Sequence, residues 1–262
     1  SDVAYEPYQS INSWSCTPCK AYQVSTPKTF TNSSGNIQGF TGYASNLNAI
    51  IVAFRGSVDI KNWILNLDAG QTTYADCTGC KVHAGFYYGW KSVQNQVHSQ
   101  ISDLIGKHKG AKIYVTGHSL GASLSFLAST YIKDTFGVMT AMYAFGCPRV
   151  GNAAYAKWIE GKVTGYRIIH YADVVAHIPP ANMGFTHGMN QYWYDEAMST
   201  RQTCSAEDGC ANSISVTKFS VDDHDLEKYY MKVKSVNEKE SFLDRIWQSY
   251  QEKKARFMPR FG

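Results

Sequence analysis

Long apolar runs, repeats and a strong overall charge are all missing from this sequence. No stretch of 18 consecutive apolar residues occurs, so the sequence predicts no membrane-spanning helix. No internal repeat or low-complexity linker is present, and 262 residues, 44% of them hydrophobic, are enough for a single domain over 1–262. The net charge of +4 lies in residues 231–262, which hold 8 Lys or Arg and 4 Asp or Glu. One short basic tail is no binding surface for nucleic acid, so no such partner is expected.

Cysteine is also uncommon, and its spacing argues against two of its uses. Among the 7 cysteines, two C-x-x-C pairs are separated by 57 residues, which is poor spacing for a zinc site. Neither pair opens a helix after a strand, as a thioredoxin-like redox motif would. Turn residues flank both pairs, so we predict local disulfides and a buried, inert thiol at Cys147. The predicted bridges are Cys16–Cys19, Cys77–Cys80 and Cys204–Cys210.

These disulfides bear on where the protein works, because they persist in oxidising compartments. We therefore expect a secreted protein, or one in the lumen of a secretory or degradative compartment. No signal peptide is visible, and the start at Ser1 is typical of a mature chain after removal of a targeting segment. The sequon that begins at Asn32 fits this location and makes Asn32 a candidate glycosylation site.

The most informative segment has the spacing Gly117-x-Ser119-x-Gly121. An apolar, β-branched run at 112–115 precedes it and predicts a buried strand, while small and apolar residues at 122–128 predict a helix packed on a sheet. A sharp strand-to-helix turn of this kind exposes the serine oxygen, and flanking glycines let the two elements approach closely. The helix N-terminus behind the serine also favours developing negative charge. The segment therefore predicts a nucleophilic Ser119.

A nucleophilic serine needs a histidine base and an acid that orients this base, commonly in the chain order Ser, acid, His. Asp173 is the favoured acid because it follows an apolar strand, whereas Asp195 precedes a long loop. His187 and His224 both lie downstream in loop-like surroundings, and the polar loop around His224 is typical of an exposed imidazole. His118 lies inside the turn itself and is interpreted as structural.

Several blocks together resemble one family, the class 3 lipases of the filamentous-fungal type with their feruloyl esterase relatives. The blocks occur in order from about residue 50 to 230, so the resemblance covers most of the chain. They are Ala53-Phe54-Arg55-Gly56-Ser57, Val82-His83-Ala84-Gly85-Phe86, residues 116–121, Phe145-Gly146-Cys147-Pro148-Arg149-Val150-Gly151-Asn152, residues 170–180, His187 with Tyr192-Trp193, and Asp223-His224.

This resemblance implies an α/β-hydrolase fold, with a central, mostly parallel sheet flanked by helices and a short helical lid. It implies a triad of Ser119 as nucleophile, His224 as base and Asp173 as its orienting acid. The backbone N–H groups of Ser57 and Leu120 would form the oxyanion hole, with the Ser57 hydroxyl as a possible third donor. No metal or cofactor is expected. The chain departs from the family in having no candidate cysteines for the long bridge between the two ends.

The segment 58–67 bears on the substrate class. Its apolar residues Ile60, Trp63, Ile64 and Leu67 follow the i, i+3, i+4, i+7 spacing of an amphipathic helix. The simple interpretation is a helix docked on the core. Because relatives carry a mobile lid at this position, the resemblance implies that these residues cover the active site in water and turn to lipid at an interface. Feruloyl esterases of the family carry a polar segment here, so the stripe favours a lipase.

A second departure is the length of the C-terminus, where 38 residues follow His224. The extension at about 235–262 contains an apolar stripe at helical spacing and a basic balance of charge. Two interpretations stay open: a helix docked on the body, or an interfacial helix attracted to anionic lipid. The stripe consists of Phe242, Leu243, Ile246, Trp247 and Tyr250.

The predicted activity is therefore hydrolysis of carboxylic esters of lipids by a monomer at a lipid–water interface, with triacylglycerol as the first substrate. Feruloyl-type esterase and phospholipase A1 activities are the enzymatic alternatives. A catalytically inactive lipid-binding relative is the alternative from another class, and the complete set of triad residues argues against it.

Overall fold

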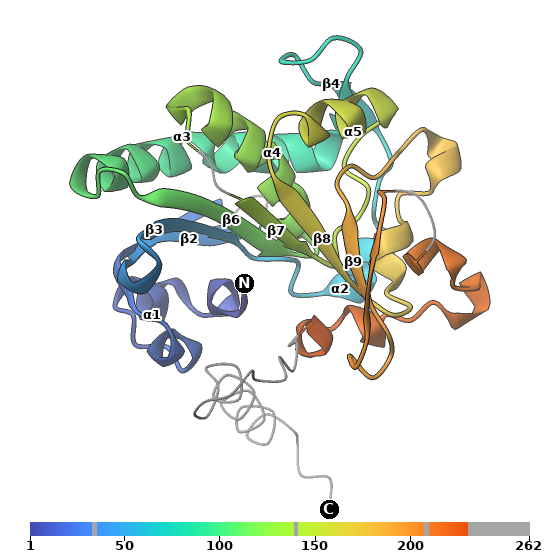
Figure 1. Ribbon diagram of the computed structural model, residues 1–262, viewed down its shortest axis with the longest axis horizontal. Helices are drawn as coiled ribbons and strands as arrows, with labels where there is room; N and C mark the ends of the chain where they lie inside the picture. The colour runs from blue at the N-terminus through green and yellow to red at the C-terminus, as the bar shows by residue number, and fades with distance from the viewer. Residues whose placement is uncertain (33–35, 139–140, 207–209, 230–262) are drawn as a thin grey trace, which may run out of the picture.

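A computed structural model describes residues 1–32, 36–138, 141–206 and 210–229 (Figure 1). The predicted extension at 235–262 and two of the three sequon residues, Ser33 and Ser34, lie outside these ranges. Among the described residues, no helix is long and apolar enough to cross a membrane. The described part also holds no group of three or more His, Cys, Asp or Glu side chains arranged to bind a metal ion.

An eight-stranded sheet forms the centre of the molecule, in the order β1-β2-β3-β6-β7-β8-β9-β10. The strands β3, β6, β7, β8 and β9 pair in parallel. At one edge of the sheet β2 pairs antiparallel with β3, and β1 with β2; at the other edge β10 pairs antiparallel with β9. The strands span Val24–Asn32 (β1), Ile37–Ala44 (β2), Ala49–Phe54 (β3), Lys112–His118 (β6), Ala141–Phe145 (β7), Gly165–His170 (β8), Gln191–Tyr194 (β9) and Arg201–Cys204 (β10). A separate hairpin pairs β4 (Gln71–Thr73) with β5 (Lys81–His83).

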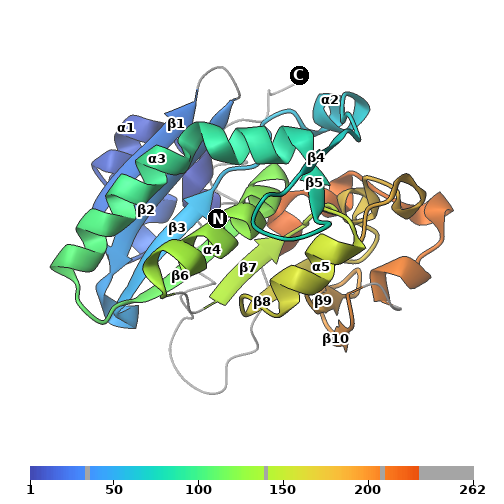
Figure 2. The same ribbon diagram turned by 90° about the horizontal axis from the view of Figure 1, so that it is seen from above.

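Three helices, α3, α4 and α5, cover one face of the sheet, and α1 lies with the N-terminal segment on the opposite face (Figures 1 and 2). The helices span Tyr8–Asn12 (α1), Ile60–Leu65 (α2), Ala84–Lys107 (α3), Leu120–Phe136 (α4) and Ala153–Glu160 (α5). Short 3-10 helices are η1 (Asp2–Tyr5), η2 (Pro18–Ala21), η3 (Ser45–Leu47), η4 (Val174–His177), η5 (Ala181–Met183), η6 (Cys210–Ser213), η7 (Val216–Lys218), η8 (Asp222–His224) and η9 (Leu226–Tyr229).

The main core lies between the sheet and the helices α3 and α4. Strand β6 alternates its side chains, so that Ile113 and Val115 point into this core and are completely buried. Helix α4 is rich in Ala and Ser, which lets its axis approach β6 and β7 closely, and its buried Leu124 belongs to the same core. The predicted strand at 112–115 and helix at 122–128 are both confirmed, with β6 ending at His118 and α4 beginning at Leu120. The expected α/β-hydrolase arrangement is present.

Parallel pairing determines where the functional residues meet. The strands β3, β6 and β8 all end at the same edge of the sheet because they run in the same direction. Ser57 follows β3, Ser119 follows β6 and Asp173 follows β8. The carboxyl edge of the strands is where ligands bind in open α/β sheets, so the fold brings these three residues to one location.

All three predicted disulfides are confirmed: Cys16–Cys19, Cys77–Cys80 and Cys204–Cys210. Each closes a short loop, which places little constraint on the unfolded chain, so their effect is local. Cys147 is a buried free cysteine, as predicted. Burial raises the pKa of its thiol to about 12, which keeps the sulfur protonated and unreactive.

Candidate active site

Ser119 occupies the sharp turn between β6 and α4, with a positive φ of 60° and a ψ of −129°. A non-glycine residue rarely adopts a positive φ, so the fold holds this residue in a strained conformation that turns its side chain away from the main chain. Glycine is required on both sides. A Cβ on Gly117 would collide with the backbone of Gly121, and one on Gly121 would collide with the carbonyl of Phe54 at the end of β3.

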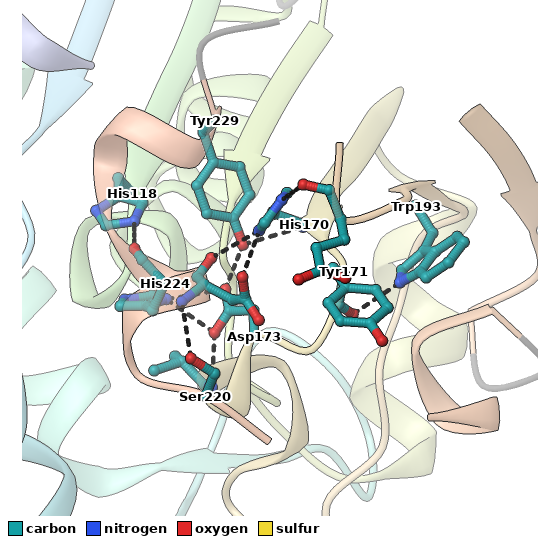
Figure 3. A network of polar contacts seen from close by, with 11 residues as sticks. His118, His170, Tyr171, Asp173, Trp193, Ser220, His224 and Tyr229 are labelled. Carbon is teal, nitrogen blue, oxygen red and sulfur yellow. Dashed lines mark hydrogen bonds and ion pairs between the residues drawn. The ribbon is translucent and has the colours of Figure 1, made fainter. Parts of the chain in front are cut away.

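Asp173 and His224 form a hydrogen-bonded pair beside this turn (Figure 3). The His224 Nδ1 atom lies 3.0 Å from Oδ1 and 2.9 Å from Oδ2 of Asp173. A carboxylate only accepts, so Nδ1 carries the hydrogen and the Nε2 atom of the neutral imidazole is left as an acceptor. This is the tautomer that a general base needs.

The Asp173 carboxylate is completely buried and has two further donors. The Val175 N–H at the start of η4 donates to Oδ1 at 2.8 Å, and the Tyr229 hydroxyl donates a short hydrogen bond to Oδ2. Burial and the adjacent carboxylate raise the pKa of Tyr229 well above its usual range, so this phenol keeps its proton and remains a donor. Sequence reasoning missed Tyr229, because a single tyrosine in a polar stretch carries no pattern that reveals a partner 56 residues away.

Ser119 and His224 line one cavity of about 230 Å³, together with Tyr5, Ser57 and Ile60. The Ser119 Oγ and His224 Nε2 atoms are both buried, and neither has a hydrogen-bond partner among the described residues. The prediction of an exposed imidazole at His224 is wrong, since only 2% of the side chain is accessible to solvent. Its neighbours in the sequence are polar, but the His224 ring itself is stacked on the ring of His118.

The two residues predicted to form the oxyanion hole, Ser57 and Leu120, both line a larger cavity next to Ser119. Leu120 is the first residue of α4, where backbone N–H groups have no partner within the helix. Ser57 lines both the small cavity with Ser119 and this larger cavity, which has a volume of about 720 Å³. The predicted donors therefore lie at the junction of the two cavities.

The predicted amphipathic helix at 58–67 is found as α2, with Asp59 capping its N-terminus through the Asn62 N–H. Its predicted apolar face is the partly buried one, whereas Leu65 on the other face is 81% exposed. Ile60 lines the small cavity, and Trp63 lines the large cavity while stacking on Phe86 with ring centroids 6.2 Å apart. Helix α2 thus borders both cavities, and Ile64 and Leu67 belong to the same partly buried face.

The alternative acid and base have other partners. The His187 Nε2 atom lies 2.7 Å from the Ala176 carbonyl, and burial lowers the pKa of this imidazole well below its usual range. Asp195 accepts hydrogen bonds from Ser199 and Thr200 in an exposed turn that links β9 to β10. Neither residue lines a cavity with Ser119.

Comparison with known proteins agrees with this geometry. The family model described as "Lipase (class 3)" matches residues 51–183. The lipase of Rhizomucor miehei is 32% identical over 221 residues, and the secreted mono- and diacylglycerol lipase A of Penicillium cyclopium is 30% identical over 185 residues. These matches cover 80% and 70% of this chain, which spans 61% of the length of each relative.

A solved structure gives the same result at the level of the fold. It is a triacylglycerol lipase whose catalytic centre is described as a serine protease triad, and it superposes with a TM-score of 0.74 at 30% identity. The superposition covers 85% of this chain and 91% of that one. Since the family model matches half of the sequence and the fold is shared, this chain belongs to the class 3 lipase family.

Proposed function

We propose that the protein is a serine-dependent hydrolase of carboxylic esters that acts on lipids, with triacylglycerol as the first candidate substrate. One observation carries this proposal. A histidine whose Nδ1 is held by a buried carboxylate presents its Nε2 acceptor to the same cavity as a serine in a strained strand-to-helix turn. Nucleophile, base and orienting acid are the three parts that acyl transfer by a serine requires.

In the proposed reaction, Ser119 Oγ attacks the ester carbonyl while His224 Nε2 accepts its proton. The backbone N–H groups of Ser57 and Leu120 stabilise the oxyanion, and the N-terminus of α4 adds to this stabilisation. The imidazolium then gives its proton to the leaving alcohol, and water resolves the acyl-enzyme with His224 again as the base. Ser119 and His224 are not yet hydrogen-bonded, and such contacts often shorten only once substrate is bound.

The large cavity supports a lipid acyl chain as the group transferred. Its volume of about 720 Å³ lies in the range of sites that enclose a small molecule. Ile37, Trp63, Phe86 and Leu120 line it with apolar surface next to the reacting serine. We further propose that α2 is the lid, because it borders both cavities. We also propose that the protein acts outside the cell, because it contains disulfides and is similar to a relative named as secreted.

Polar side chains in the same cavity favour a second candidate, a feruloyl-type esterase. Asn32, Asn36, Asn66 and Asp68 line it in addition to the apolar residues. Such donors and acceptors suit the hydroxyl groups of a phenolic or sugar-linked ester better than a hydrocarbon chain. The preferred substrate therefore needs a direct comparison.

The test compares turnover of emulsified triolein, a dissolved short-chain ester and methyl ferulate by the wild type, Ser119→Ala and His224→Ala. Each variant should lose several orders of magnitude in kcat, and the double variant should be little worse because the residues act as a unit. Ser123→Ala is the matched control, since Ser123 is a buried serine one turn into α4 that does not line the cavity. Wild-type turnover by Ser119→Ala would end the proposal, and faster cleavage of methyl ferulate than of triolein would favour the esterase.

A further inference from the structure

Two aromatic side chains, the half-buried Tyr5 and the buried His118, connect the functional segments, although neither takes part in the proposed proton transfers. Tyr5 belongs to η1 at the N-terminus, and His118 is the last residue of β6. Both line the 230 Å³ cavity with Ser119 and His224. We propose that Tyr5 and His118 are positioning residues, which hold the segment that carries Ser57 and the loop that carries His224 in fixed relative positions. This inference rests on the proposed function.

The contacts form a continuous chain with one consistent set of protons. The His118 Nε2 atom lies 2.9 Å from the main-chain carbonyl oxygen of His224, which can only accept, so Nε2 carries the hydrogen (Figure 3). In a neutral ring Nδ1 is then an acceptor, and the Tyr5 hydroxyl, 2.8 Å away, donates to it. The same hydroxyl oxygen accepts the Gly56 N–H at 3.0 Å. One end of the chain thus lies next to Ser57 and the other is the backbone of His224.

The electrostatics favour this single arrangement. His118 is buried, and burial together with the neighbouring His224 lowers its pKa well below the usual value. Burial likewise raises the pKa of Tyr5 well above its usual range, so its hydroxyl keeps the proton that it donates. The ring of His118 stacks on that of His224, with centroids 4.5 Å apart and planes 25° apart. A neutral His118 can therefore remain next to the imidazolium that forms during turnover without charge repulsion.

Close packing at Gly56 is an independent sign that the three segments are held together. A Cβ at this position would collide with the Tyr5 hydroxyl and would approach the His118 carbonyl oxygen to 2.6 Å. The end of β3, the turn at Ser119 and the N-terminal η1 therefore meet with no room for a side chain. Tyr5 is 113 residues from His118, and His118 is 106 residues from His224, so this chain of contacts joins distant parts of the sequence.

Loss of the Tyr5 hydroxyl would leave two buried groups, the Gly56 N–H and the His118 Nδ1, without their partner. The segment at Gly56 and Ser57 and the His118 ring would then be free to shift. A displacement of about 1 Å at catalytic groups can cost about 100-fold in rate. Because the acyl group binds in the larger cavity, which Tyr5 and His118 do not line, the KM for a dissolved ester should change little.

The experiment measures kcat and KM of the full chain on a dissolved short-chain ester. We expect Tyr5→Phe to lower kcat about 10- to 100-fold and to leave KM within about 2-fold of the wild type. The matched control is Tyr22→Phe, which removes another half-buried tyrosine hydroxyl of the N-terminal segment, one that contacts Asp2 and does not line the cavity with Ser119. It should leave both constants near those of the wild type. Thermal unfolding of each variant separates loss of fold from loss of positioning.

A double-mutant cycle tests the chain of contacts itself. His118→Gln keeps an N–H that can reach the His224 carbonyl, whereas His118→Phe keeps a ring but neither hydrogen bond, so kcat should fall in the order wild type, Gln, Phe. In the His118→Phe background, Tyr5→Phe should cost less than about 3-fold, because the shared network is already broken. Additive losses, or Tyr5→Phe with wild-type kcat, would overturn the inference. A wild type that cleaves no ester would instead refute the proposed function.

Discussion

The carboxylate of Asp173 receives hydrogen bonds from three segments of the chain: η4, the loop of His224 and η9. A buried carboxylate is costly unless its lone pairs are satisfied, and here each donor also fixes its direction. The donors orient the carboxylate toward His224, and the carboxylate in turn selects the tautomer of that ring. Positioning at this site is therefore a property of several residues rather than of the triad alone.

Asp173→Asn separates geometry from tautomer choice. The amide has the same shape, but its NH₂ group can turn toward His224 Nδ1, which favours the tautomer with the hydrogen on Nε2. In a serine protease the equivalent exchange lowers kcat by about 10⁴, and we expect a fall of the same order here. Stopped assays on a dissolved ester measure it.

Asp223→Asn is the matched control for this change. Asp223 belongs to the same loop as His224, but its carboxylate lies 3.2 Å from His170 Nδ1 instead. We expect this variant to lose less than about 10-fold in kcat. Equal losses from the two variants would show that general loosening of the loop, rather than the tautomer of His224, lowers the rate.

Residues of the site differ in how far the sequence could reveal them. Ser119 lies in a local pattern, and Asp173 follows a recognisable strand, so both could be named from the sequence. His224 needed the family resemblance, because local composition could not choose between it and His187. No sequence pattern identified Tyr5 or Tyr229, because the role of each depends on a partner more than 50 residues away that only folding brings close.

Among the elements, local pattern predicted those with a strong periodicity. The strand before Ser119 and the helix α4 behind it have β-branched and small apolar residues in the expected places. The edge strand β1 contains Pro27 at an irregularity of its pairing with β2, so it lacks the simple alternation of a strand. No local pattern encodes the strand order, which depends on which apolar faces pack together across long stretches of sequence.

Helix α2 gives a prediction at this scale. If it is a lid, Trp63 contacts the cleft when closed and lipid when open, so Trp63→Ala should lower activity on emulsified triolein more than on a dissolved ester. Burial of such a side chain contributes about 1.5–3 kcal/mol, enough to shift the balance between the open and closed states. The ratio of the two activities, followed through the solubility limit of the substrate, is the measurement.

Leu65→Ala is the control for the lid, since Leu65 is apolar but lies on the exposed face of α2. It should leave the activity ratio near that of the wild type. A smooth saturation curve through the solubility limit, together with equal effects of both substitutions, would mean that α2 is a docked helix and not a lid.

At the scale of the whole molecule, the extension 235–262 lies outside the described residues, so both interpretations stay open for it: a helix docked on the body, or an interfacial helix attracted to anionic lipid. If it is a lipid anchor, its deletion should leave hydrolysis of a dissolved ester intact and weaken binding to vesicles of anionic lipid. Its basic residues would then make that binding sensitive to salt. Unfolding or aggregation of the truncated chain would show instead that the apolar stripe is part of the core. Sedimentation with vesicles at two salt concentrations makes the comparison.

Stability of the whole molecule should depend on pH most strongly through the two histidines whose pKa burial lowers furthest, with a smaller lowering at His83. Burial and the neighbouring His224 lower the pKa of His118, and burial with the guanidinium groups of Arg167 and Arg149 lowers that of His187. In the unfolded chain a histidine binds a proton at about pH 6.5, whereas these two stay neutral when folded. Below that pH the unfolded state therefore binds more protons, and the free energy of unfolding falls as the pH is lowered.

Each of these histidines contributes a slope of up to about 1.4 kcal/mol per pH unit, so urea unfolding between pH 6 and 5 should show a loss of about 2.4 kcal/mol from the two. His187→Gln should reduce that slope by about half, whatever its effect on stability at pH 7. Asp223 and Asp225 act in the opposite direction in more acidic solution, because burial raises the pKa of both carboxyl groups. The measurement therefore stays above pH 5. A free energy of unfolding that did not change between pH 7 and 5 would mean that both rings accept a proton in the folded protein. For His118 this would remove the neutral ring on which its positioning of His224 depends.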